Sequence, residues 1–136
     1  KDGDVLVMGT ITSDGATSTA MEGAHYKTAR NEWINSQFSA WDGAHTVMED
    51  LIIDNLNDED SYKHIETTYR DIKTEAIANE INKILADAGY SQRVVVGDLF
   101  VTCTFSAKNA FGGTIKNTAF GISSYADNRF TLIDIG

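Results

Sequence analysis

Two hydrophobic periodicities divide this chain. A helical period governs the first two thirds, and a strand-like alternation governs the last third. Apolar residues recur at helical spacing in three stretches, which predicts helices at residues 18–37, 42–56 and 74–88. Asp42 and Thr74 are suitable N-cap residues for the second and third of these helices, and Gly89 lies where a glycine commonly ends a helix.

Alternation of apolar and polar residues predicts the strands, at residues 5–12, 62–72, 93–96, 99–106, 114–124 and 130–135. In the second of these, Ile65, Thr67 and Tyr69 share one face, and His64 lies on the other. Short turns with glycine or asparagine join the last strands, which indicates antiparallel hairpins. The expected fold class is α+β: one domain, residues 1–136, with a sheet of about four to five antiparallel strands packed against two or three helices.

Charge narrows the choice of partner. The chain has 20 acidic and 11 basic residues and a formal net charge of −9. Such a field repels phosphate backbones, so no nucleic-acid partner is expected, and a cationic partner fits better.

No apolar run approaches the roughly 20 residues that span a bilayer, so no transmembrane segment is expected. The acidic stretch at 54–60 lacks the glycine and ligand spacing of a calcium loop and indicates a solvated turn.

The single cysteine, Cys103, is the first candidate for catalysis. It could act as a nucleophile with His64 or His25, yet it alternates with Val101 and Phe105 on the face expected to be buried. The chain also lacks a nucleophile elbow, a phosphate-binding loop and a dinucleotide fingerprint. We therefore expect no catalytic residues and no cofactor.

Two carboxylate–histidine pairs are the best metal candidates. Glu22 with His25, and Asp42 with His45, have the carboxylate-x-x-His spacing that places both groups on one face of a helix. Two ordinary helix N-termini with surface histidines explain the same spacing, because short motifs match often by chance.

Four aromatic residues around the junction of the first two helices are the best candidates for binding a ligand or partner. They are Trp33, Phe38, Trp41 and Tyr62. Tryptophan and tyrosine are enriched at interfaces, although such residues also form ordinary core.

A family resemblance rests on two parts of the sequence. Residues 38–45 (FSAWDGAH) lead into 55–67 (NLNDEDSYKHIET), and residues 97–101 lead into 105–113 (FSAKNAFGG). Together they resemble small uncharacterised bacterial domains, often secreted, lipid-anchored or phage-related, with an "LxDPDSYxHIET … KNAFGG" pattern over residues 38–135. Glu59 replaces the usual proline, and residues 73–95 look like an insertion. The resemblance implies an envelope or secreted location and no catalytic residues.

These observations together predict a non-catalytic extracytoplasmic domain that binds a protein or peptide. Two alternatives stay open: an acidic inhibitor of the phage or immunity type that blocks a basic target, and a metal-dependent hydrolase using His25, His45 and nearby carboxylates. An open sheet edge also allows a homo-oligomer.

Overall fold

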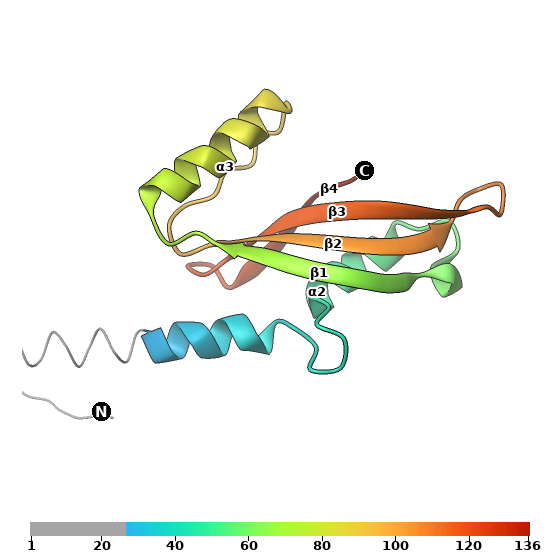
Figure 1. The fold of residues 1–136 in the computed structure, drawn as a ribbon, viewed down its shortest axis with the longest axis horizontal. Coiled ribbons are helices and arrows are strands. Elements are labelled where there is room, and N and C mark those ends of the chain that lie inside the picture. Colours follow the sequence, from blue (N-terminus) through green and yellow to red (C-terminus); the bar gives the residue numbers. More distant parts are fainter. Residues whose placement is uncertain (1–26) are drawn as a thin grey trace, which may run out of the picture. The chain divides into compact units, whose positions relative to one another are not determined.

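The structure, a computed structural model, describes residues 27–136 (Figure 1). The chain divides into two units, one on either side of the boundary between residues 36 and 37. Residues 27–36, in the first unit, are helical, which agrees with the last part of the first predicted helix. The predicted strand at 5–12 and the predicted start of that helix lie outside the described residues.

The second unit has the predicted α+β fold. Its four-stranded antiparallel sheet has the strand order β1-β2-β3-β4, with consecutive strands joined as neighbours. The elements are α2 (Thr46–Asp54), a 3-10 turn η1 (Glu59–Ser61), β1 (Lys63–Asp71), α3 (Glu75–Asp87), β2 (Leu99–Lys108), β3 (Thr114–Ser124) and β4 (Arg129–Ile135). The two helices lie on opposite faces of the sheet (Figure 1).

Helix α2 covers the face of the sheet that carries the alternate apolar residues of β2. Val101, Cys103 and Phe105 are buried on this face, as their alternation predicts. From α2, Met48 and Ile52 are fully buried, so the helix contributes two large side chains to this core. Burying a side chain of this size stabilises the fold by about 1.5–3 kcal/mol.

Helix α3 covers one end of the opposite face. The Thr74 hydroxyl accepts a hydrogen bond from the Ile77 N–H (3.2 Å), so the predicted N-cap is confirmed. Gly89 follows the C-cap with φ +91°, as expected of a helix-ending glycine. The helix buries its apolar stripe in a core cluster made of Ile72, Ala78, Ile81, Leu85, Val94 and Ile122.

The predicted strand at residues 93–96 is wrong, because this segment pairs with a helix side chain and not with a strand. The amide of Asn82 in α3 accepts from the Val94 N–H (2.7 Å) and donates to the Val94 C=O (2.9 Å). The Val95 N–H donates to the Asp98 carboxylate. These side chains occupy backbone groups that a sheet would need.

A β-bulge in β1 changes which side chains face α2. The register shifts between His64 and Glu66, so Ile65 is the extra residue of the bulge. His64 then pairs with Phe105 and Thr67 with Cys103, which places both on the α2 face. The prediction that His64 and Thr67 lie on opposite faces is therefore wrong. Strict alternation fails here because a bulge adds one residue to one strand only.

Candidate functional site

Residues 38–45 form a closed loop, the Trp41 loop, before α2. Phe38 and His45 make an antiparallel bridge at its base. Within it the Ser39 N–H donates to the Ala44 C=O (2.8 Å), and the Gly43 N–H donates to the Ser39 C=O (2.9 Å). Gly43 has φ +76°, a conformation that glycine adopts without steric cost. The loop therefore has a defined shape fixed by its own backbone.

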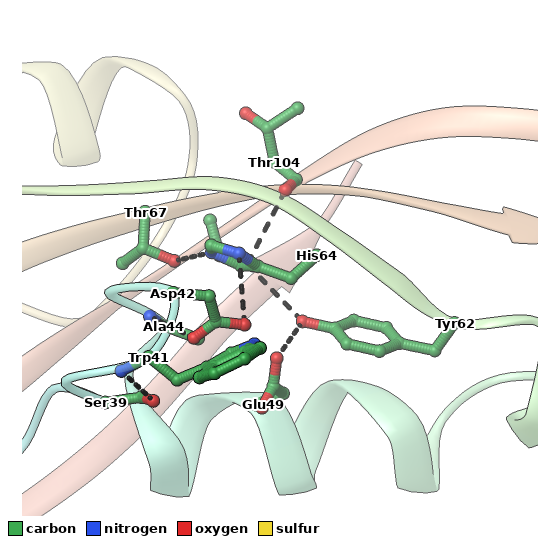
Figure 2. Close-up of polar contacts among 10 residues, drawn as sticks. Ser39, Trp41, Asp42, Ala44, Glu49, Tyr62, His64, Thr67 and Thr104 are labelled. Carbon is green, nitrogen blue, oxygen red and sulfur yellow. Dashed lines mark hydrogen bonds and ion pairs between the residues drawn. The ribbon is translucent and has the colours of Figure 1, made fainter.

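Trp41 stands at the tip of this loop with 94% of its surface exposed. Its backbone N–H donates to the Ser39 hydroxyl (3.1 Å), and the next residue, Asp42, accepts from the Ala44 N–H (3.0 Å). Figure 2 shows the contact of Trp41 with Ser39 on the loop above α2. The backbone on either side of the indole is thus held while the indole itself faces solvent.

The second oxygen of Asp42 joins the loop to the sheet. It lies 3.5 Å from His64 Nδ1, and His64 Nε2 lies 2.7 Å from the Thr67 hydroxyl (Figure 2). The His64 side chain is only 8% exposed. The bulge at Ile65 makes this arrangement possible, because it turns His64 toward the loop and α2.

Tyr62 and Glu49 form a second polar pair beside Asp42 and His64 (Figure 2). The Tyr62 hydroxyl donates to the Glu49 carboxylate of α2 (2.7 Å), and its oxygen lies 3.9 Å from Cys103 Sγ. Burial, followed by the hydrogen bond to Glu49, raises the pKa of Tyr62. Burial also raises the pKa of the Cys103 thiol, and hydrogen bonds with Thr67 and Tyr62 oppose that shift only in part. A thiol that stays protonated is a weak nucleophile.

His45 is the N-cap of α2, a position that the sequence pattern predicts for Asp42. Its Nδ1 accepts from the Met48 N–H (3.1 Å), so Nε2 carries the proton and donates to the Gln37 side-chain oxygen (2.9 Å). The ring is 2% exposed and lies against Phe38 and Phe130. Burial lowers its pKa to about 4, so the neutral ring is the form that fits.

The order Asp42–His64–Thr67 is the carboxylate–imidazole–hydroxyl order of a nucleophilic triad. His64, Thr67 and Cys103 line neither the hollow beside the end of α2 nor the one beside α3. The 3.5 Å separation of Asp42 and His64 is also longer than a good hydrogen bond. The arrangement supports a positioning role, in which the sheet holds the Trp41 loop.

Two of the four metal candidates, Glu22 and His25, lie outside the described residues, so that prediction stays a prediction. Asp42 and His45 are described, but they do not face one another as a ligand pair. Both ring nitrogens of His45 make hydrogen bonds, and Asp42 contacts Ala44 and His64. Among residues 27–136, no group of three or more histidine, cysteine, aspartate or glutamate side chains is placed to hold a metal.

The four aromatic candidates have different surroundings. Trp33 lies in the helical segment 27–36, where the Arg30 guanidinium is 6.0 Å from its ring. Phe38 stacks on Tyr69 at 5.1 Å, and Tyr62 packs beside Phe105, so both are partly buried against neighbouring rings. Trp41 is the member that the structure presents to solvent.

Phe111, which is absent from the predicted site residues, is 96% exposed in the turn between β2 and β3. Its position in a glycine-containing turn was the available signal. The sequence indicates His64 only as a candidate partner of Cys103, because its contact with Asp42 depends on the bulge.

No protein-family model matches this chain, and neither a curated protein nor a solved structure is significantly similar to it. Among the described residues, no helix is long and apolar enough to cross a bilayer. The family resemblance therefore stays a hypothesis, and the site's geometry is the main guide to function.

Proposed function

We propose that this chain is a non-catalytic extracytoplasmic domain that binds a protein or peptide through Trp41. The observation that carries this proposal is a tryptophan 94% exposed on a loop with a defined backbone. Fully burying such a side chain in a partner removes about 200 Å² from water, worth about 4–5 kcal/mol before the costs of association.

The loop's construction reduces one of those costs. Ordering a mobile segment on binding opposes association, so an already ordered loop binds more tightly. The Trp41 loop is closed by its own hydrogen bonds and joined to the sheet through Asp42 and His64. The contacts of Asp42 with Ala44 and His64 therefore support binding by holding the backbone beside Trp41.

The location outside the cytoplasm rests on the sequence resemblance of residues 38–135 and is part of the proposal. Fractionation of the cells that make this protein, followed by detection with an antibody, tests it directly. Recovery in the cytosolic fraction alone contradicts the location and leaves the binding role to be tested separately.

The binding role is tested with a random peptide library displayed on phage and selected against the full chain. We expect the selected peptides to bind the unmodified protein and to lose at least about 30-fold in affinity with Trp41→Ala, the size of a hot-spot effect. Trp41→Phe should recover part of that loss, because it keeps an aromatic ring.

Phe111→Ala is the matched control, because Phe111 is equally exposed but lies on a different turn. It should leave the affinity unchanged if binding occurs at Trp41. Equal losses in Trp41→Ala and Phe111→Ala, or no loss in either, would contradict the assignment to this loop. Circular dichroism of each variant shows whether the fold is kept.

A further inference from the structure

A second surface, distinct from the Trp41 loop, lies at the other end of α2. A hollow of about 770 Å³ lies between the end of α2, the β2–β3 hairpin and β4. This volume is within the range of pockets that bind ligands or peptide side chains. Part of its lining is apolar, formed by Leu51, Leu56, Ala107, Ile115, Leu132 and Ile135.

Four consecutive residues of β4, Leu132 to Ile135, line this hollow. Leu132 and Ile135 pair with residues of β3 that face α2, whereas Asp134 pairs with Phe120 on the α3 face. The Asp134 side chain accordingly contacts the Tyr90 hydroxyl on the α3 side. Side chains of these four residues thus lie on both faces of the sheet. A hollow that all four line therefore reaches the backbone at the edge of the strand.

That edge is open within the described part of the chain. β4 is the last strand in the sheet order and pairs there with β3 alone. The Asp134 carboxylate accepts from the Ile135 N–H, so a side chain already occupies the edge at that end. The segment before Ile135 is where an added strand would pair. Extended peptides commonly bind in this way, with backbone hydrogen bonds for affinity and pockets for alternate side chains.

Charge around the hollow selects the kind of peptide. Six carboxylates and no lysine or arginine lie between Thr46 and Tyr62. Asp54 and Asp58, both exposed, flank the lining residues 55–57. The negative end of the α2 dipole lies here too, and the last turn has no basic residue to offset it. Lys108 is the one cation in the lining, so the rim has an excess of negative charge.

We propose that this hollow binds an extended peptide that adds a strand to the edge of β4, with apolar side chains at alternate positions and basic residues at one end. The apolar side chains enter the hollow beside Leu51 and Leu132, and the lysine or arginine residues at the end of the peptide reach the carboxylates after α2. A second copy of this chain fits less well, because it has the same net charge of −9.

The test uses the full isotope-labelled chain and short synthetic peptides. A peptide of alternating valine and threonine that ends in two lysines is compared with one that ends in two glutamates. A third peptide keeps the lysine sequence but has methylated nitrogens in its valine–threonine segment, which removes hydrogen-bond donors at unchanged charge. We expect only the first to bind measurably and to shift the amide resonances of residues 131–134.

Charge is then tested on the protein side. Asp54→Asn with Asp58→Asn should weaken binding roughly fivefold at low salt, as expected for two exposed charges. The matched control, Glu75→Gln with Asp127→Asn, removes the same charge on other surfaces and should have little effect. Leu132→Lys places a cation in the hollow and should abolish binding, while Trp41→Ala should not.

Several results would overturn the proposal. Equal binding of the glutamate peptide rejects the charge preference, and equal binding of the methylated peptide rejects strand addition. Shifts elsewhere than β4 reject the site. Shifts at β4 that depend on protein concentration without peptide identify a second copy as the occupant and also reject it. Because Trp41 is not involved, none of these results decides the proposed function.

Discussion

Two loops of this protein present an almost fully exposed aromatic residue, but they are built differently. The turn between β2 and β3 is local: the Asn109 side chain accepts from the N–H groups of Phe111 and Gly113, both at 3.0 Å. The Trp41 loop adds a tertiary contact, because Asp42 reaches His64 in β1. Exposure alone therefore does not distinguish the two aromatic residues, whereas coupling to the core does.

The coupling has a second anchor at the base of the Trp41 loop. His45 caps α2 through Met48 and contacts Gln37, whose side-chain oxygen also accepts from the Ser123 hydroxyl of β3. His45 thus connects the Trp41 loop to α2 directly and to the sheet through Gln37. A change in this core should move Trp41, while the same change should leave Phe111 where it is.

The largest expected effect is that of His45→Ala. It removes the helix cap, worth about 1 kcal/mol. It also removes the hydrogen bond to Gln37 and leaves a space between the rings of Phe38 and Phe130. The free energy of unfolding should therefore fall by about 3–4 kcal/mol. Urea denaturation measures this. Asn109→Ala in the other loop should cost only about 1 kcal/mol, because its contacts are local and exposed. Similar losses in the two variants would contradict the difference between the loops.

The second effect is a dependence of stability on pH. The pKa of His45 is about 4 in the folded protein and 6.5 in its ordinary state. The unfolded chain therefore binds more protons between these values, so stability is full above pH 6.5 and falls as the pH drops toward 4. The loss should reach up to about 3 kcal/mol.

His45→Asn is the control for this titration, because asparagine can cap the helix but does not titrate in this range. Urea denaturation at a series of pH values should give a flatter profile for the variant between pH 6.5 and 4. A profile as steep as that of the unmodified protein would assign the dependence to other groups. The turn at Phe111 holds no histidine, so it should not contribute.

The sequence predicts the local elements well because their signals are local. Alternation in β2 and β3, the cap at Thr74 and the glycine at position 89 each depend on a few neighbouring residues. The turn at Phe111 is of the same kind. The hydrogen bonds of this turn join residues that are close in the chain, so the local sequence is enough to predict the turn.

The Trp41 loop is harder to predict because its contacts cross the chain. The bulge that turns His64 toward Asp42 exists only when β1 pairs with β2, and no property of Ile65 alone predicts it. The cap at His45 was missed for a similar reason. Asp42 is the commoner capping residue, but its carboxylate contacts Ala44 and His64, and the imidazole three residues later caps α2.

A smaller effect should follow from Asp42→Asn, which tests the tertiary link directly. The asparagine oxygen can still accept from the Ala44 N–H, so the loss should be confined to the contact with His64. It should cost at most about 1 kcal/mol, because the two groups are 3.5 Å apart and the Asp42 side chain is 36% exposed. Hydrogen exchange should become faster at the Gly43 amide and stay unchanged at the Gly113 amide. Equal acceleration at both amides would mean global destabilisation and would contradict a local link.

The same variant connects the structure to the proposed function. Peptides selected for binding at Trp41 should bind Asp42→Asn more weakly, although the indole itself is unchanged. The reason is that a less ordered loop has more conformational entropy to lose on binding. Unchanged affinity together with faster exchange at Gly43 would show that the loop's order does not contribute to binding.

The last effect is of similar size, concerns the other loop and completes the comparison. Gly112 has φ +83°, and a methyl group added at this position would meet open space, so Gly112→Ala is opposed by backbone strain alone. The expected cost is about 1 kcal/mol, measured by urea denaturation. Exchange at Gly43 should not change, because no contact within residues 27–136 joins the turn directly to the Trp41 loop. A change there would show that the two loops are coupled through the sheet, which their separate hydrogen bonding argues against.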